Sequence, residues 1–124
     1  MINVKDKIYA AIAEQFDNVS DHYPDDFKVL PAIQYVEEEN KVFEHTFGKN
    51  GIPQEDKSQL RFKIDIWDDK STSQTALKVD EIIASFGFVR TQCMDNPSSR
   101  TYRHKIMRYE GIIDNKTEKV YWNR

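Results

Sequence analysis

The chain has 124 residues, a length that ordinarily forms one domain, and it carries a net charge of −3 at neutral pH. Aromatic residues make up 12% of the sequence, too large a share for a disordered acidic chain. The acidic balance excludes a protein that grips nucleic acid through its phosphates. A single cysteine excludes an internal disulfide, and no apolar stretch is long enough for a membrane span or a signal segment. We therefore expect a soluble protein made in the cytoplasm.

The first predicted element is a helix over residues 3–16. Its apolar residues recur at helical spacing and form one stripe: Val4, Ile8, Ala11, Ile12 and Phe16. Asn3 is expected to cap this helix, and Asp6 in the first turn suits the positive end of the helix dipole. The pattern predicts a helix with one buried face.

Residues 17–47 are predicted to form three strands. A short edge strand precedes the turn at Tyr23-Pro24. Residues 32–37 have strand composition, and residues 41–47 alternate well enough to return as the partner strand. The polar residues 38–40 are predicted to form the turn between these two strands.

Residues 48–58 hold two of the four glycines and a proline, and they are predicted to form the longest irregular loop. Long loops in compact domains are usually mobile or functional. The clearest strand follows at residues 59–67. One of its faces carries Leu60, Phe62, Ile64 and Ile66, and the other carries Arg61, Lys63, Asp65 and Trp67.

A second helix is predicted to begin at Ser71, which fits a capping box with Gln74. Its buried stripe consists of Ala76, Val79, Ile83 and Phe86. Gly87 occupies the position where a helix end favours a left-handed residue. Residues 88–93 are then predicted to form a short strand, and residues 94–100 a loop.

The last predicted elements are strands. A long strand covers residues 101–110, Ile112-Ile113 extend it, and residues 120–122 add a final hairpin. Runs of strands interrupted by helices predict a single α+β domain over residues 1–124. We expect a mostly antiparallel sheet of about four to six strands in the order αβββαββ. Two helices pack on one face, and a neighbouring subunit covers the other.

One short pattern could carry chemistry. Asp25 after Pro24, followed by Glu39 and Lys41, fits the Pro-Asp…Glu-x-Lys pattern of magnesium-dependent nucleases. Such sites need two carboxylates for the metal and a lysine that orients the attacking water. The nuclease hypothesis requires the side chains of Asp25, Glu39 and Lys41 to lie around one cation, and it is kept as an alternative.

Other candidate sites have weaker signals. The acidic clusters at residues 37–39 and at Asp65, Asp68 and Asp69 are expected to be solvated. His22, His45 and His104 lack zinc-site spacing, and Cys93 is expected to be a buried, inert thiol. Salt bridges are expected for the basic group Arg90, Arg100, Arg103, Lys105 and Arg108. We therefore expect no catalytic residue, cofactor or metal.

Several ordered segments nevertheless resemble one family. They are Tyr23-Pro24, residues 30–35 with residues 37–40, residues 62–67, Ile82-Ile83, residues 87–91 and residues 102–109. The set is similar to the tail-completion, or head–tail joining, proteins of long-tailed bacteriophages and their prophage relatives. It covers nearly the whole chain up to about Glu110, and the element order matches that family's layout.

The resemblance implies a structural protein, not an enzyme. Its subunits would form a ring, usually a hexamer, that closes the end of the tail tube and joins tail to head. The implied partners are further copies of the chain, the major tail tube protein and the neck protein, while DNA passes the bore without specific binding. The protein would act in the host cytoplasm during assembly and then in the virion.

The family's contacts come from loops and strand edges. These would map to residues 47–57, to the loop at 94–100 and to residues 111–124 as a partner-binding extension. The implied interface residues are Phe47, Lys49, Asn50, Ile52, Gln54, Glu55, Ile113, Tyr121 and Trp122. Besides the nuclease, a binding module or prophage adaptor without a ring remains an alternative.

Overall fold

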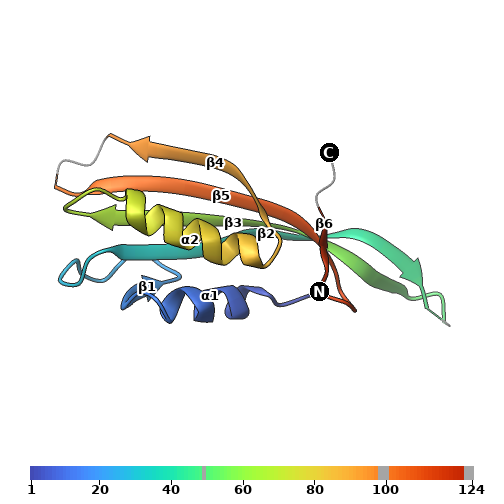
Figure 1. Ribbon diagram of the computed structural model, residues 1–124. Helices are drawn as coiled ribbons and strands as arrows, with labels where there is room; N and C mark the ends of the chain where they lie inside the picture. The colour runs from blue at the N-terminus through green and yellow to red at the C-terminus, as the bar shows by residue number, and fades with distance from the viewer. Residues whose placement is uncertain (49, 98–100, 122–124) are drawn as a thin grey trace.

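Two helices and a six-stranded sheet make up the chain in the computed structural model, which describes residues 1–48, 50–97 and 101–121 (Figure 1). In chain order the elements are α1 (Lys5–Ala13), β1 (Asn18–Ser20), β2 (Ala32–Phe47), β3 (Pro53–Asp68), α2 (Ser73–Ser85), β4 (Val89–Asn96), β5 (Arg103–Asp114) and β6 (Val120–Tyr121). The predicted α+β class is confirmed. The order ends in one more strand than the predicted αβββαββ, because β6 forms the final hairpin with β5.

The strands lie in the order β1-β2-β3-β5-β4, and β6 pairs with the end of β5. Among the described residues, β1 and β2 pair in parallel and the other ladders are antiparallel. The sheet is therefore mostly antiparallel, as predicted. Its two long central strands, β3 and β5, place their alternating side chains on opposite faces.

One face of the sheet and both helices share a single apolar core. The predicted stripe of β3, which consists of Leu60, Phe62, Ile64 and Ile66, is fully buried in it. From the helices come Ile8, Ile12, Ala76, Val79 and Ile83, and from β5 come Met107, Tyr109 and Ile113. The opposite face, which carries Arg61 and Lys63, is called the open face below.

The predicted turn at residues 38–40 is wrong, because β2 runs without interruption from Ala32 to Phe47. The pairing of β2 with β3 instead shifts register between Glu37 and Glu39, as at a β-bulge. The carboxylates of Glu38 and Glu39 form ion pairs with Arg108 and Arg61 across the sheet. Glu38 and Glu39 thus bind residues of other strands, and Asn40 donates to the carbonyl of Ile2, so the polar character of these residues does not mark a chain reversal.

The predicted loop at residues 48–58 is also wrong. β3 already begins at Pro53, which pairs with Phe47, so the reversal occupies only the few residues between them. Gly48 donates its N–H to the carbonyl of Ile52 at 2.8 Å, and Gly51 has a positive φ of 71°. The glycines therefore form a hairpin turn between two long strands.

The helix starts differ from the predicted caps. Val4 occupies the N-cap of α1, while the amide of Asn3 bonds the carboxylate of Asp6 at 2.8 Å. Thr72 occupies the N-cap of α2, and Ser71 accepts a bond from the N–H of Ser73 in place of a capping box. The predicted helix end is confirmed, since Gly87 follows α2 with a φ of 96°.

Candidate functional site

The distal halves of β2 and β3 form a projecting hairpin, which we call the arm: residues 41–48 and 50–56. β5 pairs with β3 only from Lys57 onward, so β2 is the only described strand that pairs with β3 beyond that point. Every residue of β2 from 41 to 47 is exposed. Figure 1 shows this hairpin reaching beyond both helices and beyond β6. The arm is a two-stranded element that is exposed on both faces beyond its base, where Glu55 and Asp56 are partly covered.

Large apolar side chains are exposed along the arm. Val42 is 52% exposed, Phe43 42%, Phe47 68% and Ile52 64%. They account for four of the eleven large hydrophobic side chains that are exposed among the described residues. Single exposed apolar residues need no explanation, but a group of them on one projecting element is typical of a protein interaction site.

A polar cluster fixes the base of the arm to the rest of the molecule. The hydroxyl of Ser58, which is fully buried, lies 2.9 Å from Glu55 Oε2 and 2.8 Å from Asn115 Oδ1. The N–H of Asn115 donates to the carbonyl of Asp56 at 2.9 Å. Burial alone would raise the pKa of Glu55, but bonds from the Met1 amino group, Ser58 and Asn115 outweigh it and lower this pKa. The direction of the arm is thus set by contacts to the β5–β6 turn.

The structure brings five of the predicted interface residues together on the arm: Phe47, Asn50, Ile52, Gln54 and Glu55. Glu55 is the least available of them, because its carboxylate is engaged in the base cluster. Val42 and Phe43, which sequence reasoning missed, extend the apolar surface along β2. Their apolar character within a polar run was the available signal.

The remaining predicted interface residues have different outcomes. The prediction of Ile113 as an interface residue is wrong, since its side chain is 1% exposed and belongs to the core. Tyr121 lies exposed on β6, with the ammonium groups of Lys57 and Lys119 over its ring at 6.0 Å and 5.3 Å from the centroid. Lys49 and Trp122 lie outside the described residues.

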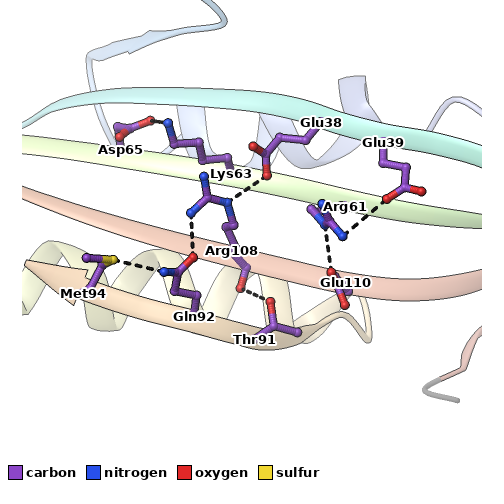
Figure 2. Close-up of polar contacts among 10 residues, drawn as sticks. All are labelled: Glu38, Glu39, Arg61, Lys63, Asp65, Thr91, Gln92, Met94, Arg108 and Glu110. Carbon is purple, nitrogen blue, oxygen red and sulfur yellow. Dashed lines mark hydrogen bonds and ion pairs between the residues drawn. The ribbon is translucent and has the colours of Figure 1, made fainter. Parts of the chain in front are cut away.

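Ion pairs cross the open face from strand to strand (Figure 2). Arg61 contacts Glu110 of β5 at 2.8 Å and Glu39 of β2 at 3.6 Å. Arg108 contacts Glu38 at 3.0 Å and the side-chain carbonyl of Gln92 at 2.6 Å. The hydrogen bond with Glu110 is the main cause that raises the pKa of Arg61. As far as the structure describes this face, its arginines are thus paired within the chain and form no concentrated basic patch for phosphates.

The predicted salt bridges are confirmed for part of the basic group. Besides Arg108, Arg90 pairs with Asp80 at 3.0 Å and Lys105 pairs with Asp95 at 2.9 Å. Arg100 lies outside the described residues. These contacts link β4 to α2 and to β5, so the basic residues serve the packing of their own chain.

A histidine and a carboxylate meet at the end of the open face. Asp65 is 2% exposed, which corrects its predicted solvated position, and its Oδ1 lies 2.7 Å from His104 Nε2. Asn96 Nδ2 lies 3.1 Å from His104 Nδ1, and the imidazole stacks on Trp67. Both ring nitrogens of His104 therefore have hydrogen-bond partners within the chain, and these contacts fix the orientation of the imidazole.

The nuclease pattern does not form a site. Asp25 follows Tyr23, whose ring contacts Trp67, whereas Glu39 lies opposite Arg61. The six residues that separate Arg61 from Trp67 along β3 span roughly 20 Å. Glu39 is instead paired with Lys41 at 2.9 Å, and the hydrogen bond from Lys41 is the main cause that lowers its pKa. Among the described residues, no three histidine, cysteine or carboxylate side chains are grouped as metal ligands.

Cys93 was predicted to be buried, but it is exposed on β4. The helices share their core with β3 and β5, and residues 89–95 of β4 are all exposed. The error has a physical reason: β4 is an edge strand whose residues 89–95 take no part in the core that the helices share with the central strands.

Comparisons with protein-family models and with curated proteins give no match for this chain. Within the described residues, neither helix has the length and apolar character that crossing a bilayer requires.

Proposed function

We propose that the chain is a structural subunit of the phage tail-completion type, which assembles into a ring at the end of the tail tube and joins tail to head. The observation that carries the proposal is the arm. It projects from a well-packed body and exposes Val42, Phe43, Phe47 and Ile52. The sequence resemblance to tail-completion proteins is the second support.

The arm has the physical properties of an element that docks. A lone two-stranded hairpin is marginally stable in water, so a partner that covers the arm would also order it. Fully burying one large apolar side chain contributes about 1.5–3 kcal/mol, and the arm offers several. We propose that each arm contacts a neighbouring copy or the tube. Such head-to-tail contacts close into a ring when the rotation between subunits permits it.

The charge distribution is compatible with a ring around DNA. The chain carries a net charge of −3, and the charged residues of the open face are paired with one another. A bore with this balance would let DNA slide, because like charge opposes adhesion to phosphates. The proposed partners are the tail tube protein and the neck protein. The proposed locations are the host cytoplasm during assembly and later the virion.

The first experiment is light scattering and electron microscopy of the purified chain, alone and mixed with tail tubes of the phage or prophage that encodes it. We expect rings in solution, or a smaller species that caps the tube ends. A chain that neither forms rings nor binds tubes would contradict the proposal and favour a binding module of another kind.

A pair of variants locates the contact. Phe47→Ser combined with Ile52→Ser is expected to abolish ring formation or tube capping while the fold is kept, because both side chains are exposed. Leu77→Ser is the matched control, since Leu77 is 64% exposed on α2 and lies off the arm. Equal binding by both variants would exclude the arm as the docking element.

A further inference from the structure

β4 is an edge strand that the fold leaves open. It pairs only with β5 among the described strands, and residues 89–95 are exposed. From Gln92 to Asn96 its register with β5 is regular, so the outer edge presents the backbone N–H and C=O groups of every second residue. Such an edge is a template for the addition of another strand.

The opposite edge of the sheet is protected. β1 pairs with the first residues of β2, from Ala32 to Gln34. Beyond them the β2 ladder shifts register at three places, and residues 37–39 are all glutamates. Bulges and charges are the usual means by which proteins prevent strand addition at an edge. Among the described strands, β4 is therefore the edge best suited to pairing.

The sequence of β4 shows none of these protections in its regular part. It has no lysine or proline, and its exposed side chains include Cys93 and Met94. The two charged residues of β4 lie near its ends: Arg90 is held by Asp80, and Asp95 by Lys105. The middle of the strand is consequently neutral.

We propose that β4 pairs with β4 of a second copy in antiparallel orientation, which joins two sheets into one across a two-fold axis near Cys93. In antiparallel pairing, Arg90 of each copy lies toward Asp95 of the other, so the two-fold axis creates this favourable approach at both ends. Parallel pairing would instead bring like charges together. With the axis at Cys93, Gln92 lies opposite Met94 of the second copy, and no like charges are opposed.

This contact is separate from the proposed ring contact. In Figure 1, β4 points toward the end of the sheet opposite the arm. The two-fold pairing therefore leaves the arm free to dock, and either inference can fail without the other.

The test is the mass of the purified chain by light scattering across a dilution series, with two edge variants. The wild-type chain is expected to be a dimer that dissociates on dilution. Met94→Lys and Gln92→Lys bring lysines to the pairing edge and are expected to give a monomer, while Leu77→Lys stays dimeric. Met94 is 44% exposed, so the circular dichroism spectrum is expected to stay unchanged.

Cys93 gives a second, independent readout. Directly opposed residues of antiparallel strands have Cα atoms about 4.5–5.5 Å apart, which is within disulfide range. Diamide, which takes up the two electrons and two protons of the thiols, is expected to give a covalent dimer of the wild-type and Leu77→Lys chains and much less of Met94→Lys.

Three results would overturn the proposal. They are a wild-type monomer at every concentration, a dimer that Met94→Lys leaves intact, and a dimer that diamide does not link through Cys93. Rings of Met94→Lys that contain no β4-linked dimer would support both proposals, because the edge contact is then lost while the arm contact is kept. Capture of an extended peptide of another protein by a monomeric chain would assign the β4 edge to a different occupant.

Discussion

The same two strands have opposite surroundings in their two halves. In the body, residues 57–67 of β3 lie between β2 and β5 and have one face covered by the helices, so Phe62 and Ile64 are fully buried. In the arm, residues 53–56 pair only with β2, and Phe47 is 68% exposed. The backbone ladder is continuous through both halves. Cover by the helices, together with pairing to a second strand, β5, is therefore what separates the core-packed half from the half available to partners.

The largest expected contrast is between two phenylalanines. Phe62→Ala in the body is expected to lower the free energy of unfolding by about 3–5 kcal/mol, because it leaves a cavity in the core. Phe47→Ala in the arm is expected to change it by less than about 0.5 kcal/mol, as for other exposed sites. Urea denaturation followed by circular dichroism measures both. A similar loss in both variants would mean that the arm is packed in the free protein.

A second prediction sharpens the comparison inside the body. The hydroxyl of Tyr109 donates to Asp80 at 2.7 Å, and burial together with this bond raises the pKa of Tyr109. Tyr109→Phe is expected to cost about 1.5–3 kcal/mol, the usual range for a hydrogen bond to a charged group.

Tyr35 provides the control for this variant. It is equally buried, but its hydroxyl has no hydrogen-bond partner among the described residues. Tyr35→Phe is expected to be neutral or stabilising by up to about 1 kcal/mol, because it removes an unsatisfied polar group. Equal destabilisation by the two variants would show that ring packing, and not hydroxyl pairing, governs both sites.

Glycines give the third contrast. A Cβ atom at Gly111 in β5 would lie 2.6 Å from the Phe88 ring and 2.8 Å from Val120, so Gly111→Ala is expected to cost about 1–3 kcal/mol through overpacking. At Gly48 in the arm the nearest atom would be 3.5 Å away, and Gly48→Ala is expected to change stability by less than about 0.5 kcal/mol. Thermal unfolding of both variants checks the difference.

The smallest effect concerns charge. The pKa of Glu39 is lowered, chiefly by its bond from Lys41 and also by Arg61. The carboxylate therefore stabilises the fold above its ordinary pKa, and this contribution is lost as the pH falls through the lowered value. Glu39→Gln is expected to cost at most about 1 kcal/mol at neutral pH and nothing in acid.

Glu44 is the arm counterpart of Glu39. It lies 3.4 Å from Lys57 and is largely exposed, so Glu44→Gln is expected to have a smaller effect at neutral pH. Urea midpoints of both variants, measured at neutral pH and below the carboxyl range, provide the comparison. An equal pH dependence for the two glutamates would remove the distinction between body and arm for charged residues.

The sequence predicted best where one face of an element is covered. β3 was recognised from Leu60 to Ile66 because a buried face imposes a period of two, and α2 was recognised from its apolar stripe and Gly87. The β2 side of the arm, residues 41–47, was predicted as a strand, but residues 48–58 were predicted as a loop because this exposed segment has no such period. Its residues were nonetheless among those expected at the interface.

The other errors have related causes. Glu38 and Glu39 bind arginines of other strands on the open face, and Asn40 binds the backbone of Ile2; local sequence cannot reveal such contacts. Cys93 was expected to be buried because its residue type usually is, but cover depends on how far the helices reach. Asp65 is buried through His104, 39 residues further along the chain. Cross-strand partners of this kind depend on the fold and not on spacing.

The long β2–β3 hairpin also has a consequence for the order in which the chain folds. At the turn, its ladder pairs Phe47 with Pro53, which are only six positions apart in the sequence. At the far end it pairs Ala32 with Trp67. Hairpins form within about 1–10 μs, whereas contacts between distant residues are slower because a longer loop must close first. The β3–β5 ladder joins Lys57 to Asp114 across α2 and β4. We therefore expect the folding rate to be set by the docking of β5, with the hairpin that ends in the arm already formed when it arrives.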